Sequence, residues 1–208
     1  MNREELQARY RVERDKRIRP EGADQYITPT GQWTALFEDP YTEVVGREPQ
    51  RRDLDALIVG AGFSGLIMGA KLRQSGVDDF VMLDRAGDVG GVWYWNRYPN
   101  CACDVESYVY LPLLEVTGYM PTEKYAKAHE IFAYCQLLGR TLDIYKNALF
   151  QTEVVDMRWD DTAQRWHTVT NRGDDLSSKF VIIAGGVLHR PKLPAVDGIH
   201  RYKGHSFH

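Results

Sequence analysis

A short apolar run, a glycine-rich turn and a second apolar run that ends in an acid constrain this chain more than any other stretch. Leu54–Val59 has the length of a strand, Gly60-Ala-Gly-Phe-Ser-Gly65 follows at once, and a helix-compatible segment leads to Phe80–Asp84. A helix that begins at such a turn offers free N–H groups to an anion. Asp84 lies 24 residues after Gly60, close to the roughly 20 residues expected for an acid that binds a ribose diol. This order predicts an α/β, Rossmann-like three-layer dinucleotide-binding fold.

Each glycine of the turn has a separate expected role. Gly60 permits the tight turn, Gly62 lets the backbone approach a pyrophosphate, and Gly65 lets the helix pack close to the strand. The carboxylate of Asp84 would repel a 2′-phosphate, which favours FAD or NAD over NADP, whereas Arg85 argues the other way. The alternative is a tight strand–helix turn that binds no ligand.

The next stretch, Gly90–Asp104, is unusually aromatic. It combines a glycine pair, four aromatic residues, one arginine and one aspartate within fifteen residues. Flat side chains beside a flexible glycine pair suit a flat ring system held near a backbone turn. A loop that only fills the core is the alternative, because buried aromatic residues are common.

This stretch resembles the fingerprint of the Baeyer–Villiger monooxygenases, a branch of the class B flavoprotein monooxygenases. The matching residues are Gly90, Gly91, Trp93, Tyr98, Pro99 and Asp104. Asn100 departs from the family's glycine or methionine, but asparagine enters left-handed backbone space more readily than other non-glycine residues. The resemblance implies a two-dinucleotide-binding flavoprotein that is incomplete here, because a second glycine-rich unit for NADPH and the family's catalytic arginine are absent.

The resemblance also implies roles for individual residues. The expected contacts of the FAD pyrophosphate are Gly60, Gly62, Ser64 and Gly65, and that of the adenosine ribose is Asp84. The stretch around the flavin end comprises Gly91, Val92, Trp93, Tyr94 and Trp95, and further positions that line the FAD site are Tyr110 and Val154. The residues expected to approach NADPH are Ala102, Cys103 and Asp104. Asp104 is the expected catalytic residue, because in the family this carboxylate pairs with the arginine from a later part of the chain.

The function implied is that of the FAD-binding portion of an NADPH- and O₂-dependent monooxygenase. Such an enzyme inserts oxygen next to a ketone carbonyl to give an ester or lactone, through a C4a-peroxyflavin, and the isolated chain is expected to be inactive. A related flavin N- or S-oxygenase and a non-catalytic nucleotide-binding module are the alternatives. Tyr202–His208 resembles the start of the family's second fingerprint, with tyrosine in place of phenylalanine, and ends before its last position. The run from Trp93 to Asp104 is therefore the only stretch that distinguishes a Baeyer–Villiger enzyme from a flavin N- or S-oxygenase here.

Composition and charge exclude several other classes of protein. The net charge of −3 provides no general basic field for nucleic acid. The longest apolar stretch, Leu57–Ala70, is too short for a membrane span, and the first residues contain no apolar signal region, so a cytoplasmic location is expected. Three cysteines, an odd number, predict free thiols. Cys101 and Cys103 are interpreted as loop-filling residues rather than metal ligands, because no second pair follows at zinc spacing.

Two domains are expected, an N-terminal extension over residues 1–52 and a FAD-binding Rossmann-like domain over residues 53–208, truncated before an NADP domain. Arg3–Arg19 has seven basic and four acidic residues and predicts a solvated helix. Glu21–Arg52 carries regularly placed aromatic residues, which predict an arm packed on the body rather than a free linker.

The second half of the chain predicts a helix, a hairpin and a strand. Thr122 and Glu123 are expected to open the helix; its apolar stripe is Ile131, Phe132, Cys135, Leu138 and Leu142. Phe150–Trp159 and Arg165–Thr170 flank a polar turn and predict an inserted β-hairpin. Phe180–Ala184 is a buried strand by composition, and the glycine pair after it either approaches a ligand or forms a flexible turn.

Overall fold

Residues 2–204 are described by the computed structural model of this chain, which has two compact units. One unit consists of Met1–Glu38 together with Arg190–His208, and the other of Asp39–His189. The predicted domain boundary between residues 52 and 53 stays a prediction. Within the described residues, no helix has the length and apolar character needed to cross a membrane.

The smaller unit consists of short elements and one exposed helix. Its elements are α1 (Arg3–Asp15), η1 (Gly22–Gln25), β1 (Tyr26–Ile27), η2 (Gly31–Phe37), β8 (Leu193–Pro194) and η4 (Ile199–Arg201). β1 and β8 pair antiparallel, with Tyr26 opposite Pro194. The predicted fingerprint start at Tyr202–His208 falls largely outside the described residues.

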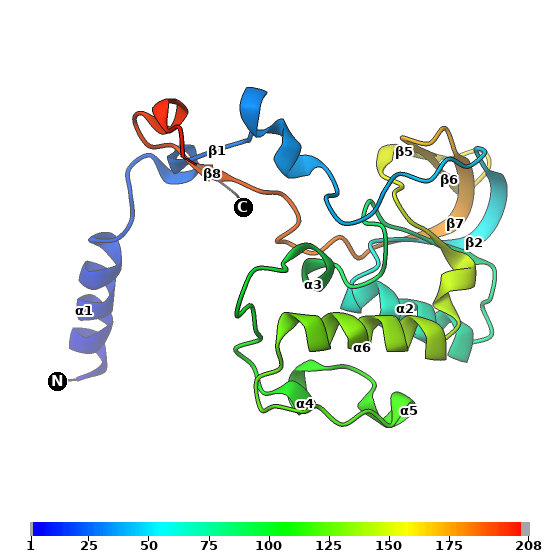
Figure 1. Ribbon diagram of the computed structural model, residues 1–208, viewed down its shortest axis with the longest axis horizontal. Helices are drawn as coiled ribbons and strands as arrows, with labels where there is room; N and C mark the ends of the chain where they lie inside the picture. The colour runs from blue at the N-terminus through cyan, green and yellow to red at the C-terminus, as the bar shows by residue number, and fades with distance from the viewer. Residues whose placement is uncertain (1, 205–208) are drawn as a thin grey trace. The chain divides into compact units, whose positions relative to one another are not determined.

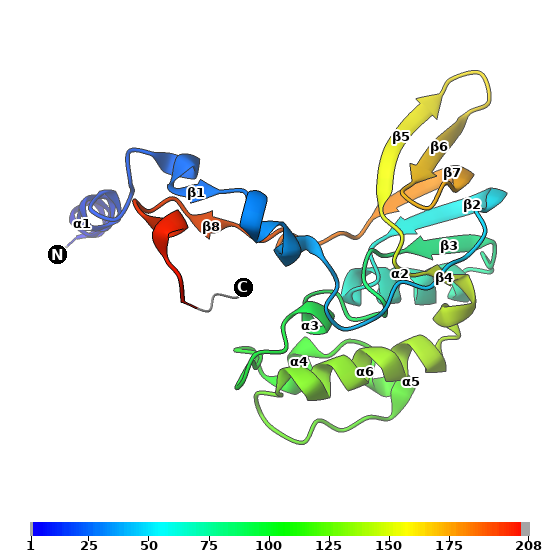
Figure 2. The same cartoon turned by 45° about the horizontal axis from the view of Figure 1, so that its top comes forward.

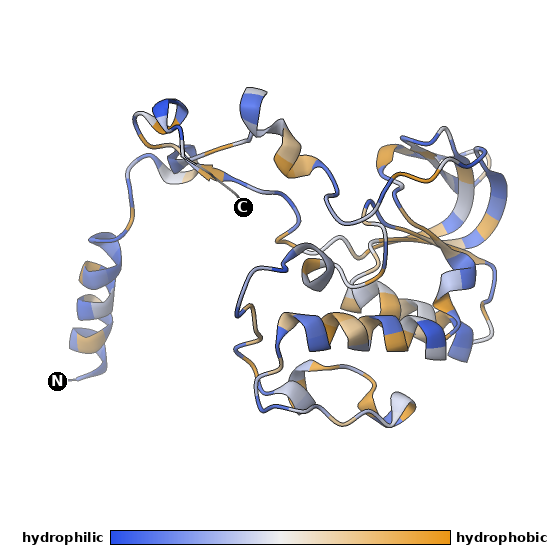
Figure 3. Ribbon diagram, in the orientation of Figure 1, coloured by the Kyte–Doolittle hydropathy of each residue, from blue (hydrophilic) through white to orange (hydrophobic). Residues whose placement is uncertain are grey.

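Helix α1 is solvated, as predicted. None of its residues is buried, and Figure 3 shows a largely hydrophilic ribbon. Asn2 and Glu5 form a capping box, in which each side chain accepts the other residue's backbone N–H at 2.9 Å. The helix ends at Asp15, four residues before the predicted end at Arg19.

A six-stranded sheet organises the larger unit, in the order β4-β3-β2-β7-β6-β5 (Figure 2). The strands are β2 (Arg51–Val59), β3 (Phe80–Leu83), β4 (Ala148–Leu149), β5 (Val154–Asp160), β6 (Arg165–Thr170) and β7 (Asp175–Ile183). β4, β3, β2 and β7 are parallel, whereas β6 and β5 are antiparallel to their neighbours. This is the predicted α/β Rossmann-like arrangement with an inserted hairpin.

Helices α2 (Phe63–Gln74) and α6 (Ala128–Thr141) lie beside each other under this sheet (Figures 1 and 2). The main apolar core forms between them and the sheet; its buried members include Ile58, Phe80, Leu66, Ile131 and Leu138. A smaller apolar cluster is formed by Leu54, Leu57, Val81, Leu83 and Leu176. Alternation along the strands separates the two clusters, because successive side chains point to opposite faces of a sheet.

The predicted start of the long helix was wrong. α6 begins at Ala128 rather than at Thr122 or Glu123. Thr122 donates its backbone N–H at 2.7 Å and its hydroxyl at 2.8 Å to the Glu130 carboxylate, so it joins the loop to the helix and does not cap the helix. In the predicted stripe Ile131, Cys135 and Leu138 are buried. Phe132 and Leu142 pack against the core at its margin.

The hairpin is confirmed with a shorter first strand. β5 starts at Val154 instead of Phe150 and pairs with β6 so that Asp160 lies opposite Arg165. The Asp160 carboxylate accepts the N–H groups of Thr162 and Ala163 at 2.8 and 2.9 Å. These two hydrogen bonds lower the pKa of Asp160, as expected for an acid that closes a turn.

The predicted burial of Phe180–Ala184 was wrong. The strand exists as the end of β7, but the side chains of Phe180 and Ile183 are 66% and 70% exposed. Helix α2 packs on β2 and β3, and at this end of β7 Ile182 and Ala184 are only partly buried at the margin of the main core. Composition identified the strand correctly but could not show which strands the helices cover.

This exposure predicts a contrast in stability between two positions on β7. Phe180→Ser should change the free energy of unfolding by less than about 0.5 kcal/mol, the usual range for exposed sites. Leu176→Ala should lower it by about 2–5 kcal/mol, because Leu176 is fully buried. Urea unfolding of the two variants measures both effects, and equal losses would show that Phe180 is covered in solution.

Candidate dinucleotide-binding site

The parallel strands end together at one edge of the sheet. Val59 lies opposite Leu83 of β3 and Ile183 of β7, and the Gly60 N–H donates to the Leu83 carbonyl at 2.7 Å. The chain leaves β2 towards β3 on one side and returns through β7 on the other. Cofactors bind at this kind of switch point in doubly wound sheets.

The first glycine turn connects β2 to α2 as predicted. Gly60 has a φ of +111°, and a Cβ at this residue would overlap the Ala184 carbonyl. A Cβ at Gly65 would likewise overlap the Gly60 carbonyl, so the helix packs directly on the turn. Gly62 is the N-cap, and its carbonyl accepts the Leu66 N–H at 3.0 Å. The N–H groups before Leu66, including that of exposed Ser64, have no acceptor within the helix.

The second glycine pair touches the first turn through backbone atoms. Gly90 donates its N–H to the Ala61 carbonyl at 2.9 Å. Gly91 has φ +57° and ψ −123°, and a Cβ at this residue would lie 2.9 Å from the Gly62 Cα. No side chain separates the two turns, so together they form a cradle of bare backbone beside the start of α2.

Asp84 lies directly after β3 and is hydrogen-bonded to this cradle at Ala61. Its carboxylate accepts the Ala61 N–H at 2.6 Å and the Ala86 N–H at 2.8 Å. Burial raises its pKa, against the opposing effect of these two hydrogen bonds. A carboxylate has about four lone-pair sites, so Asp84 keeps acceptor capacity for a ribose diol. Arg85 stacks over the Trp95 ring at 4.7 Å and donates to the His189 carbonyl at 2.9 Å.

Trp93 and Tyr110 meet at the first residue of α2. They come from two short helices, α3 (Val92–Trp95) and α4 (Ser107–Tyr110), the second of which is followed by α5 (Leu114–Thr117). The Trp93 indole N–H donates to the Tyr110 hydroxyl at 2.9 Å, and the Phe63 ring packs edge-on against Tyr110 with centroids 5.5 Å apart. Burial raises the pKa of Tyr110, which keeps the phenol protonated. Phe63 was not predicted, because it occupies a variable position of the glycine motif.

Tyr94 and Trp95 contact a different set of residues. Tyr94 is buried, and its hydroxyl donates to the Asp39 carboxylate at 2.6 Å. Trp95 packs edge-on against Tyr94 with centroids 5.2 Å apart. Their side chains are thus engaged by the protein itself, and roles at a flavin stay predictions for these two positions.

The segment from Cys101 to Asp104 is held by the loop before α6. Cys103 donates its N–H to the Ala126 carbonyl at 3.0 Å, and Ala102 forms a β-bridge with Lys127. Asn100 has a φ of +64°, which confirms that it takes the left-handed conformation in the place of glycine. Asp104 is exposed, and within residues 2–204 its carboxylate forms no ion pair.

Val154 lies at the start of β5. It packs against the smaller apolar cluster, which includes Leu83 at the end of β3. The Thr152 N–H donates to the Asp84 carbonyl at 2.8 Å, so this segment passes next to the predicted ribose acid. The structure therefore brings Val154 towards the same edge of the sheet as Asp84.

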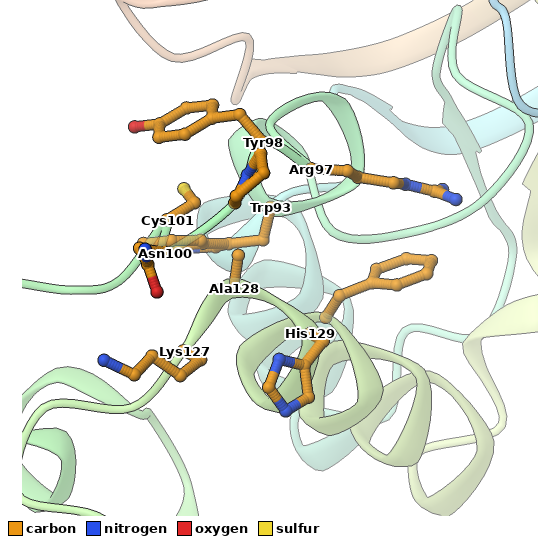
Figure 4. A pocket seen from close by; sticks show the side chains of 10 residues that line it. Trp93, Arg97, Tyr98, Asn100, Cys101, Lys127, Ala128 and His129 are labelled. Carbon is orange, nitrogen blue, oxygen red and sulfur yellow. The ribbon is translucent and has the colours of Figure 1, made fainter.

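A pocket of about 470 Å³ borders the aromatic loop (Figure 4). Its lining comes from the loop and the first turns of α6: Trp93, Arg97, Tyr98, Pro99, Asn100, Cys101, Lys127, Ala128, His129 and Phe132.

The three cysteines are free and buried, which confirms the predicted thiols, and burial raises the pKa of Cys135. Among residues 2–204 no group of histidine, cysteine or acidic side chains is arranged to hold a metal ion.

Comparison with known proteins agrees with this geometry. Residues 58–122 match the family model of an NAD(P)-binding Rossmann-like domain. The chain is 49% identical over 206 residues to neopentalenolactone D synthase of Streptomyces avermitilis, with 99% of this chain and 35% of that protein covered. A Baeyer–Villiger monooxygenase of Streptomyces coelicolor is 45% identical, with 98% and 34% covered.

Solved structures give the same result. A polycyclic ketone monooxygenase from Thermothelomyces thermophila superimposes with a TM-score of 0.82 at 35% identity, over 94% of this chain and 34% of that one. A structure of OTEMO in complex with FAD and NADP superimposes with a TM-score of 0.68 at 32% identity, over 74% and 30%. The resemblance to Baeyer–Villiger monooxygenases is confirmed, and the chain spans about a third of the length of the curated relatives that it matches.

Proposed function

We propose that this chain binds FAD at the carboxyl edge of its sheet, as part of an NADPH- and O₂-dependent Baeyer–Villiger monooxygenase. The observation that carries the proposal is the contact between the two glycine turns, where Gly91 and Gly62 meet without a side chain between them. A bare backbone cradle at a helix N-terminus suits a pyrophosphate, because the N–H groups and the helix dipole both favour an anion.

The residues around the cradle fit the rest of the FAD molecule. Asp84 has acceptor capacity for the adenosine ribose, and Val154 lies towards the same edge. Trp93, Tyr110 and Phe63 supply aromatic surface beside the cradle for a flat ring system. Relatives known with both FAD and NADP support the pair of cofactors. When bound, FAD supplies the redox chemistry that joins NADPH oxidation to oxygen transfer.

In this reaction the chain's own residues would bind the cofactor, orient an arginine and exclude water. Trp93 donates to Tyr110, so the indole N–H and the phenol oxygen are paired within an aromatic wall that would keep water away from the ring system. Asp104 is exposed next to the buried Cys103 and is available to orient an arginine from elsewhere in the enzyme by a charge-assisted pair. The substrate class is a ketone, and the product an ester or lactone. Buried free thiols support a reducing, cytoplasmic location.

The catalytic role of Asp104 is tested in the longer enzyme that contains this chain. Asp104→Ala should leave FAD bound, because the glycine cradle is unchanged, and should lower ester formation by about 10²-fold, the order expected when a catalytic group is misplaced. Flavin absorbance measures binding, and chromatography of the ester measures activity. The control is Asp156→Ala, which removes an exposed aspartate elsewhere in the chain, on β5. Wild-type ester formation by Asp104→Ala would exclude the role, and a colourless wild-type protein after incubation with FAD would exclude the function.

A further inference from the structure

A short segment that precedes the sheet, residues 39–42, lies against the aromatic loop and binds it through Asp39. One oxygen of the Asp39 carboxylate accepts the Tyr94 hydroxyl at 2.6 Å and the Gly87 N–H at 3.1 Å. The other oxygen accepts the Tyr41 N–H at 2.9 Å. Thr42 completes the contact, because its hydroxyl lies 2.7 Å from that of Tyr94. A single carboxylate therefore ties together this segment, the turn after β3 and the aromatic loop.

Tyr41 adds a second set of contacts to the same loop. Its hydroxyl donates to the Trp95 carbonyl at 3.1 Å, and its ring meets the Tyr94 ring edge-on with centroids 5.8 Å apart. The Arg97 guanidinium lies 3.8 Å from the centre of the Tyr41 ring and donates from Nε to the Tyr94 carbonyl at 2.9 Å. These contacts hold the loop at Tyr94, Trp95 and Arg97.

The helix that these contacts hold is too short to keep its own position. α3 has only four residues, and an isolated turn of helix is unstable because nucleation is costly. Its first residue follows Gly91, which contacts Gly62, and its second residue is Trp93, which bonds Tyr110. Burial, followed by the hydrogen bond to Asp39, raises the pKa of Tyr94, so the phenol stays a donor. The backbone of α3 thus connects Tyr94 to the cradle and to Trp93, and the bond from Tyr94 to Asp39 adds to the contacts that fix their position.

We propose that Asp39 and Tyr94 are positioning residues, which hold the aromatic loop and the Gly90–Gly91 turn in the geometry that binds the cofactor. The inference rests on the proposed function for the identity of that cofactor as FAD. It assigns residues 39–42, which lie within the arm predicted over Glu21–Arg52, to the site itself. Neither residue needs to touch the cofactor, because Tyr94 acts through the backbone of α3.

Tyr94→Phe tests the proposal, because it removes the hydroxyl and keeps the ring that packs against Tyr41 and Phe132. Tyr119→Phe is a matched control: it also removes a phenol that donates to a carboxylate, at 2.8 Å to Glu130, away from the loop. The two variants should lose similar stability in urea unfolding. Only Tyr94→Phe should raise the FAD dissociation constant, by about tenfold, and increase hydrogen exchange of the amides of residues 90–97 in the absence of FAD.

The two measurements separate the inference from the proposed function. The inference is supported if Tyr94→Phe shows weaker FAD binding together with faster exchange of residues 90–97, and Tyr119→Phe shows neither. Unchanged exchange overturns it, whatever the result with FAD, and so does faster exchange with an unchanged dissociation constant. If the wild-type protein binds no FAD, the proposed function fails, and the exchange data alone decide whether Asp39 and Tyr94 hold the loop. Asp39→Asn provides an independent repeat from the other side of the hydrogen bond.

Discussion

Replacement of Asp84 by arginine is expected to weaken FAD binding by at least about 100-fold. The carboxylate is the expected ribose ligand, and it also accepts two backbone N–H groups, one of them in the glycine turn. Arginine has no acceptor and would leave both groups unpaired, and hydrogen bonds to charged groups contribute about 1.5–3 kcal/mol each. Titration with FAD, followed by flavin fluorescence, measures the loss.

A milder substitution tests the same prediction in a variant that is expected to stay folded. Asp84→Asn keeps the shape of the side chain and one acceptor oxygen, but its amide nitrogen can only donate. It should retain the circular dichroism spectrum and still bind FAD at least about tenfold more weakly than the wild type. Wild-type affinity in a folded Asp84→Asn protein would remove Asp84 from the site.

The sequence was sufficient to predict the parts of the site that depend on local backbone rules. The turn at Gly60, the start of α2 near Gly62 and the position of Asp84 at the end of β3 each follow from residue type and spacing, because glycine permits φ angles that other residues avoid. The left-handed conformation of Asn100 was predicted on the same basis. In each case, neighbours within a few residues determine the outcome.

The features that sequence did not show depend on contacts between distant segments. The meeting of Gly62 and Gly91, and the bond from Tyr94 to Asp39 across 55 positions, have no local signal, since each needs the tertiary fold. The exposure of Phe180 was missed for the same reason, because apolar composition cannot tell a covered strand from an uncovered one. The start of α6 was misplaced because Thr122 bonds to Glu130 from a loop, a pattern that local capping rules resemble but do not distinguish.

The largest loss of stability is expected at Asp174, which is fully buried between β6 and β7. Its carboxylate receives two parallel bonds from the Arg47 guanidinium, at 2.6 and 2.5 Å, the Gln50 N–H at 2.8 Å and the Thr170 hydroxyl at 2.6 Å. Asp174→Ala should lower the free energy of unfolding by about 3–5 kcal/mol, because it leaves Arg47 without its buried partner. Urea unfolding measures the loss.

The pH dependence identifies the carboxylate as the cause of that loss. Burial raises the pKa of Asp174, but the bonds from Arg47, Thr170 and Gln50 outweigh this effect and lower the pKa from 3.8 to about 2. For an acid whose pKa falls on folding, the stabilisation is present above the unfolded pKa and disappears as the pH falls through the folded one. Stability should therefore decline between about pH 4 and pH 2, and Asp174→Asn should lack this part of the decline. Asp55→Ala removes an exposed partner of Lys179 and should cost less than about 1 kcal/mol; an equal cost at both sites would contradict the assignment of a buried ion pair to Asp174.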